Sequence, residues 1–167
     1  MNPGTVVYVE DEEDDVFLVN YAFKEAGIPN ALVAIPDGEV ALDYLGGVGK
    51  YADRAAHPLP ILLLLDINMP LVSGLDVLRW VRSQPALHTL PTLVLSSSSQ
   101  TADIRAAYEL GANGYLVKPS ALEKLVVMVT AIRDYWLVQN QLPPPFIDVE
   151  GITRAEPPLK RGSTVPG

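Results

Sequence analysis

The sequence contains no cysteine, and this absence excludes disulfide bonds, thiol catalysis and thiolate metal sites. It fits a reducing compartment, and we expect the protein to work in the cytoplasm. Basic residues are scarce as well, with 12 Lys and Arg against 20 Asp and Glu and a net charge of −8. Because these few cations are scattered along the chain, the sequence argues against binding to nucleic acid.

Long apolar runs are also missing. No run approaches the ~20 residues that a membrane-spanning helix needs. Residues 1–4 carry neither a basic segment nor the apolar region of a signal peptide. We therefore expect neither export nor association with a membrane.

Hydrophobic residues make up 49% of the 167-residue chain and charged residues 19%, which predicts a folded globular protein with one domain of ordinary size. We assign this domain to residues 1–142. Prolines recur in residues 143–167 and no hydrophobic period is sustained there, so this stretch is expected to be a proline-rich C-terminal arm or a disordered tail.

Apolar strand-like runs alternate with helix-like segments along the first 139 residues. The expected strands are residues 5–9, 31–35, 61–65, 92–95 and 114–117, and the expected helices are residues 14–26, 38–45, 74–82, 101–110 and 121–139. Five such units predict an α/β fold, a doubly wound parallel sheet with helices on both faces. Residues 46–57 are longer than the connection needs and rich in glycine, so they are predicted to form a surface insertion.

Three carboxylates stand where predicted strands end. Glu10 and Asp11 follow the first strand, and Asp66 follows the third. In open α/β sheets ligands bind at the carboxyl ends of the strands, so these acids can converge if their strands are neighbours. Two carboxylates at ~4 Å repel by roughly 4 kcal/mol at an effective dielectric constant near 20. A cation must offset this, and oxygen ligands suit Mg²⁺.

A phosphoryl-transfer site would use these residues together. The carboxylate of Asp66 could attack phosphorus and form an acyl phosphate. Lys118, at the end of the fifth strand, would neutralise phosphoryl charge, while the Ser96 hydroxyl and the amides around Ser97 would donate to phosphoryl oxygens. Taken singly, each residue has a plainer interpretation as a helix cap, a turn residue or a surface charge. Their joint occurrence at four strand ends favours a shared site.

These motifs resemble the receiver domain of two-component response regulators. The resemblance covers residues 5–139 and rests on Val9-Glu10-Asp11, on Leu65-Asp66-Ile67-Asn68-Met69-Pro70 with Gly74, on Ser96, and on the run from Gly111 to Pro119. It implies a flavodoxin-like fold with strand order 2-1-3-4-5. It also implies a phosphoacceptor rather than an enzyme acting on a separate substrate.

The resemblance further implies roles for single residues. A histidine kinase would phosphorylate Asp66, and Mg²⁺ would be held by Asp11, Asp66 and the backbone carbonyl of Asn68, with Glu10 acting through water. Ser96 and Tyr115 would form the switch that couples the phosphoryl group to a binding surface. A cis peptide bond before Pro119 is implied as well.

A narrower resemblance connects the glycine-rich insertion and the long last helix to stand-alone regulators that serve bacterial phytochrome histidine kinases. The main alternative is a Mg²⁺-dependent phosphatase or phosphotransferase of the haloacid dehalogenase type, but that family needs its nucleophile on the first strand and a second aspartate where this chain has Asn68. A flavodoxin-like cofactor binder lacks its glycine-rich phosphate loop after Val9. A degenerate receiver would lack some of the site residues.

The last predicted helix carries more apolar surface than one sheet face needs. We therefore predict a homodimer through the fourth helix, the fifth strand and the last helix, with the proline-rich arm as a candidate for crossing between protomers. Arg133 interrupts the apolar stripe of this helix, so the far end of the stripe is not expected to be buried in the body of the domain. His57 and His88 are expected at the surface.

Overall fold

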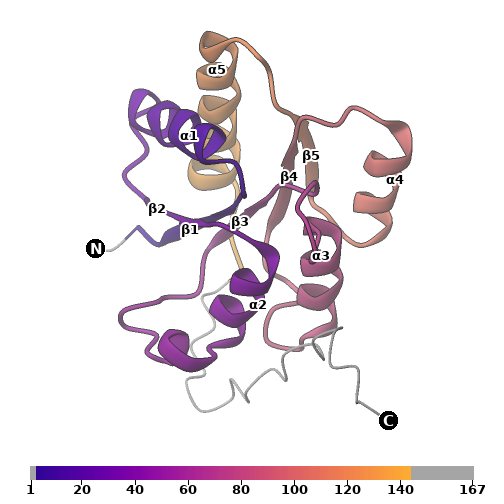
Figure 1. Cartoon of the computed structure of the whole chain (residues 1–167). Helices are drawn as coiled ribbons and strands as arrows, with labels where there is room; N and C mark the ends of the chain where they lie inside the picture. The colour runs from indigo at the N-terminus through magenta and orange to yellow at the C-terminus, as the bar shows by residue number, and fades with distance from the viewer. Residues whose placement is uncertain (1–2, 144–167) are drawn as a thin grey trace.

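The computed structural model describes residues 3–143. Its centre is a sheet of five parallel strands in the order β2-β1-β3-β4-β5 (Figure 1). The strands are β1 Thr5–Val9, β2 Ala31–Ile35, β3 Leu62–Leu65, β4 Thr92–Ser96 and β5 Gly114–Val117. The predicted strand order and flavodoxin-like fold are confirmed. The predicted proline-rich arm, residues 143–167, lies outside the described residues apart from Pro143.

Helices cover both faces of the sheet. They are α1 Glu13–Glu25, α2 Gly38–Gly46, α3 Gly74–Ser83, α4 Thr101–Glu109 and α5 Leu122–Ile132. Figure 1 shows α1 and α5 side by side on one face, and α2 and α3 on the other. This division follows from the alternation of strand side chains. Val7 and Val9 of β1 join the core under α2 and α3, whereas Val6 and Tyr8 join the core under α1 and α5.

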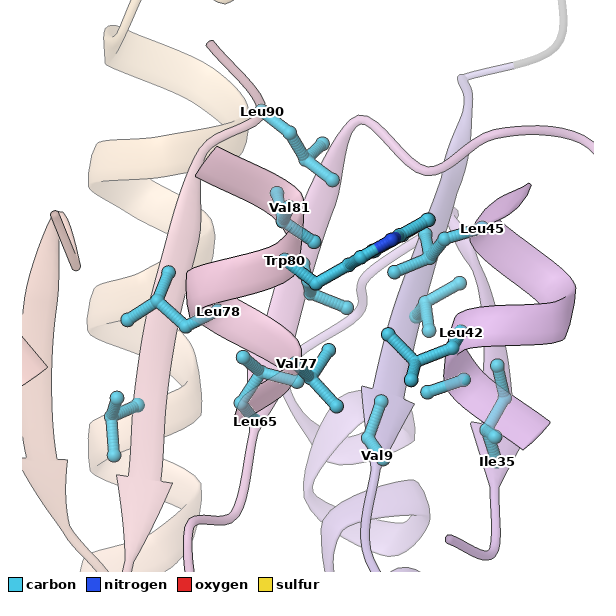
Figure 2. Packing of buried hydrophobic residues seen from close by; sticks show 14 of the residues in the cluster. Val9, Ile35, Leu42, Leu45, Leu65, Val77, Leu78, Trp80, Val81 and Leu90 are labelled. Carbon is cyan, nitrogen blue, oxygen red and sulfur yellow. The ribbon is translucent and has the colours of Figure 1, made fainter. Parts of the chain in front are cut away.

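Local signals explain where several helices begin and end. The Asp37 carboxylate accepts a hydrogen bond from the Val40 amide at the start of α2, and Gly47 ends that helix in the left-handed conformation. Ser73 and Asp76 form a reciprocal capping box at the start of α3. In the core, the Trp80 side chain of α3 lies next to Leu45 of α2 (Figure 2).

The insertion after α2 is more ordered than its glycines suggest. It contains a short 3-10 helix, η1 Gly49–Ala52. The Arg54 guanidinium donates to the carbonyls of Tyr44 and Leu45, the last turn of α2, and to that of His57. The His57 ring is half-buried against Tyr44 and Tyr51, so it is at the surface but less exposed than the sequence suggested. His88 is exposed as expected.

The last helix also differs from the prediction of one helix over residues 121–139. α5 ends at Ile132 and a π-helix, η2 Arg133–Gln139, continues from it. Arg133 turns back to donate to the Ala26 carbonyl just after α1, a partner that no local period could indicate. Tyr135 and Val138 are exposed, in agreement with the expectation for the far end of the stripe.

The cis peptide bond expected before Pro119 is not found. All peptide bonds of residues 3–143 are trans. The trans form is the intrinsically preferred isomer even before proline, by about 0.5–1 kcal/mol. That expectation is therefore wrong.

Candidate functional site

Four strand ends bring the predicted site residues to one edge of the sheet. Val9 of β1 pairs with Leu65 of β3, so the residues that follow them, Glu10 and Asp66, lie at the same level. Ser96 ends β4, and Lys118 follows β5. Glu10, Asp66 and Ser96 are buried, although all three are polar. The parallel register thus places polar side chains at the end of an apolar sheet.

Glu10, Asp11 and Asp66 form the acidic cluster. One oxygen of each carboxylate lies within 4.8 Å of the corresponding oxygens of the other two. The Asp11 Oδ1 atom is buried and has no hydrogen-bond partner among the described residues. A buried, unpaired carboxylate oxygen is costly unless a cation satisfies it. The all-oxygen donor set and this orphaned atom fit a hard divalent cation.

Lys118 is the cation that this cluster already contains. Its Nζ atom lies 2.8 Å from Glu10 Oε2, 2.8 Å from Asp15 Oδ2 and 3.4 Å from Asp66 Oδ2. Burial alone would lower the pKa of Lys118, but hydrogen bonds and charge from these carboxylates raise the pKa above its usual value. Sequence reasoning missed Asp15; its position four residues after Asp11, in the first turn of α1, is the signal that could have found it.

The Glu10 side chain is fully buried and held by several donors. Its Oε2 atom accepts from the Tyr8 hydroxyl at 3.0 Å as well as from Lys118, and Oε1 accepts from the Glu12 amide at 3.1 Å. Burial and hydrogen bonding to Asp66 raise the pKa of Glu10 to about 7, against the opposing effect of Lys118. Tyr8 was missed; a buried strand tyrosine whose hydroxyl needs a partner is the signal that could have found it.

Tyr8→Phe should lower the free energy of unfolding by about 1–2 kcal/mol, because a buried carboxylate oxygen loses a donor while the ring packing is kept. Urea unfolding followed by tryptophan fluorescence measures the change. Tyr21→Phe is the matched control, since Tyr21 lies exposed on α1 and should change stability by less than about 0.5 kcal/mol. Equal stability of the two variants would contradict an energetic role for the Tyr8 hydroxyl.

Asn68 connects Asp66 to the neighbouring strand. Its backbone amide donates to Asp66 Oδ1 at 3.1 Å, and its side-chain amide donates to the Ser96 hydroxyl at 3.3 Å. Burial would raise the pKa of Asp66, but hydrogen bonds from Glu10 and Asn68 together with the Lys118 charge hold it below its usual value. The lowered pKa favours the ionised form of Asp66, which is the form that its predicted role as a nucleophile requires.

The loop after β4 links Ser96 to Tyr115. The Ser96 hydroxyl accepts from the Ser98 amide at 3.2 Å, and the Tyr115 hydroxyl donates to the Ser98 carbonyl at 2.9 Å. The Ser98 hydroxyl in turn donates to Asp103 in the first turn of α4. Ser97 is exposed beside them. The two residues predicted to form a switch are thus joined through Ser98.

The loop between β3 and α3 is tightly packed behind Asp66. A Cβ atom on Gly74 would lie 2.1 Å from the Asp66 carbonyl oxygen, closer than any real contact. Close approach of α3 to the end of β3 is therefore possible only because residue 74 is glycine.

Leu71, in the same loop, has a backbone φ of 65°, which is unusual for a residue with a large side chain. Its side chain is exposed, with an exposed fraction of 92%.

This combination of fold and site agrees with the comparison to known proteins. A family model described as the response regulator receiver domain matches residues 6–130. The chain belongs to this family of two-component signalling proteins. The haloacid dehalogenase alternative has no support, since Asp66 follows β3 rather than the first strand.

Two response regulators of known structure are similar to this chain over most of its length. The response regulator Rcp1 of Synechocystis sp. is 36% identical over 84% of this chain and 94% of its own length, and a structure of its Mn²⁺-bound form aligns with a TM-score of 0.76, covering 84% of this chain and 99% of that one. The phosphorylated cyanobacterial phytochrome response regulator RcpA aligns with a TM-score of 0.78 at 35% identity, covering 84% of this chain and 98% of that one.

A relative named for a different role is about as similar. The probable methanogenesis regulatory protein FilR2 of Methanothrix harundinacea is 34% identical over 86% of this chain and 90% of its own length.

Among residues 3–143, no helix combines the length and hydrophobicity needed to cross a membrane.

Proposed function

We propose that this chain is a response regulator that accepts a phosphoryl group on Asp66 from a histidine kinase and then changes its partner-binding surface. The observation that carries the proposal is the buried carboxylate cluster beside Lys118, with the orphaned Asp11 oxygen facing no protein donor among the described residues. Such a site can bind a divalent cation and a phosphoryl group together, and this is the requirement of phosphoryl transfer.

In the proposed reaction an Asp66 oxygen attacks the phosphorus of a phosphohistidine. The phosphorus–nitrogen bond breaks, its electron pair stays on the imidazole, which takes a proton, and Asp66 becomes an acyl phosphate. Lys118 neutralises phosphoryl charge, and the Ser96 hydroxyl and the amides around Ser97 donate to phosphoryl oxygens. Water later cleaves the acyl phosphate, so the protein assists its own phosphorylation and dephosphorylation and acts on no separate substrate.

Mg²⁺ is the proposed cofactor. Asp11, Asp66 and the Asn68 carbonyl would bind it directly, and Glu10 would act through water. When bound, the metal would neutralise carboxylate and phosphoryl charge. The oxygen-only donor set supports a hard cation, and the relative Rcp1 has a structure with Mn²⁺ bound.

The proposed partners are a histidine kinase and a second copy of the chain. Phytochrome kinases are the proposed class, because the similar protein RcpA is a phytochrome response regulator. Exposed apolar side chains on α4, β5 and α5, namely Tyr108, Val117 and Val127, support the predicted dimer surface. Neither nucleic acid nor a membrane is expected, and the absence of cysteine favours the cytoplasm.

Labelling of the protein with acetyl phosphate tests the proposed chemistry. With Mg²⁺, intact mass should show one added phosphoryl group, and an excess of EDTA should reduce the labelling rate at least about tenfold, because the three carboxylates then repel the anionic donor. A sample with EDTA and potassium chloride at matched ionic strength separates the effect of the metal from general ionic screening. Equal labelling in EDTA would reject the proposed metal requirement.

A further inference from the structure

The three carboxylates that contact Lys118 are unequal. Glu10 and Asp15 oxygens both lie 2.8 Å from Nζ, and the Asp66 oxygen lies at 3.4 Å. The Glu10 and Asp66 side chains are 0% and 6% exposed, whereas the Asp15 side chain is 37% exposed. Asp66, the proposed acceptor, is thus the most distant of the three partners of Lys118, and Asp15 is the only one that water reaches freely.

An ammonium group has three donors, and these three carboxylates occupy all of them. A phosphoryl group on Asp66 would bring further anionic oxygens to the same place. For Lys118 to bind these oxygens, one of its present contacts must be given up. The question is which partner can leave at the lowest free-energy cost.

Glu10 cannot leave easily. Its carboxylate is buried, and the Tyr8 hydroxyl and the Glu12 amide hold it in place. Separation from Lys118 would leave a fully buried oxygen without one of its hydrogen-bond donors, which is unfavourable. Asp15, on the first turn of α1, is half-exposed and its side chain has no other hydrogen-bond partner among the described residues, so water can replace Lys118 there at little cost.

We propose that Asp15 is the resting-state counter-ion of Lys118, a positioning residue that competes with a phosphoryl group on Asp66 for this ammonium. The contact weakens the hold of the site on the phosphoryl group, and it is broken when that group is bound. The inference rests on the proposed function, because it requires Asp66 to be the acceptor. Asp15 itself touches neither the phosphoryl group nor the proposed metal.

The plainer interpretation is that Asp15 only adds negative charge to the start of α1. Glu13, Asp14 and Asp15 all lie in that first turn, where acidic groups are favourable. Asp14 separates the two interpretations. It is exposed and adjacent in sequence, and its side chain makes no hydrogen bond or ion pair within residues 3–143, so Asp14→Asn removes the same charge without touching Lys118.

Binding of beryllium trifluoride, a phosphoryl mimic that attaches to a carboxylate oxygen, tests the inference at equilibrium. The dissociation constant is read from ¹⁹F NMR at a Mg²⁺ concentration shown by titration to saturate each variant. Asp15→Asn should bind the mimic about three- to tenfold more tightly than the wild type, since a partly exposed ion pair no longer competes. Asp14→Asn should stay within about twofold of the wild type.

Asp15→Glu is the conservative variant. It keeps the charge and can still reach Lys118, so its affinity should remain within about twofold of the wild type. Equal tightening in Asp14→Asn and Asp15→Asn would overturn the inference in favour of a general charge effect, and so would an unchanged Asp15→Asn or a tightened Asp15→Glu. Urea midpoints establish that each variant is folded.

The same titration distinguishes this inference from the proposed function. Asp66→Asn should bind no mimic. A wild-type protein that binds none either would remove the proposed function and this inference with it. A wild type that binds the mimic, with Asp15→Asn unchanged, would leave the proposed function standing and reject the role of Asp15 alone.

Discussion

Asp66→Asn should take no detectable phosphoryl group from acetyl phosphate, a loss of at least about a hundredfold in labelling rate. The amide oxygen of asparagine is a far weaker nucleophile than a carboxylate. Intact mass spectrometry after timed incubation with acetyl phosphate and Mg²⁺ measures the rate. Release of the label from the wild type by hydroxylamine would identify an acyl phosphate.

Two controls make this result specific to Asp66. Asp14→Asn removes a nearby exposed charge and should be labelled at the wild-type rate. The urea midpoint of Asp66→Asn, measured without divalent cations, should equal or exceed that of the wild type, because the change removes repulsion from the acidic cluster. Full labelling of a folded Asp66→Asn protein would mean that another residue is the acceptor.

Gly74→Ala should lower the free energy of unfolding by about 2–4 kcal/mol and slow phosphorylation by about tenfold to a hundredfold. The new Cβ would lie 2.1 Å from the Asp66 carbonyl oxygen and 2.8 Å from the Asp66 carbonyl carbon and from Ile67 Cα. All three atoms are backbone, so either α3 or the end of β3 must move. Urea unfolding and the labelling rate measure the two effects.

Gly46→Ala is the matched control for this substitution. Gly46 is also a buried helical glycine, but its added Cβ would meet the Trp80 and Val48 side chains at no less than an ordinary 3.6 Å. Its stability should stay within about 1 kcal/mol of the wild type, with a tendency to increase, because alanine favours helix. Equal behaviour of the Gly46 and Gly74 variants would show that the β3–α3 junction tolerates the extra atom and that Asp66 is not positioned by it.

The sheet was predictable because each strand carries its own signal. Residues 5–9, 31–35 and 114–117 form strands as expected, since an apolar run bounded by turn or charged residues is a local property. The last helix was less predictable. Its apolar pattern continues to residue 139, yet η2 replaces the α-helix from Arg133 onward, where the Arg133 side chain contacts Ala26, 107 positions away in sequence.

The site was predictable to the extent that topology alone assembles it. Glu10, Asp66, Ser96 and Lys118 each follow or end a parallel strand, and all parallel strands end at one edge. Tyr8 and Asp15 could not be found in this way. Their roles depend on which oxygen lies within 3.0 Å of a partner, and this follows from how strand and helix pack rather than from where each one ends.

The amino-acid sequence by itself therefore determined the fold and the identity of the acidic cluster, because hydrophobic period and strand-end position are local features. Only the tertiary structure decided how the ammonium group of Lys118 is shared among Glu10, Asp15 and Asp66. Coulomb interactions and desolvation depend on distances and on access to water, and both are set when β1, β3, β5 and α1 come together.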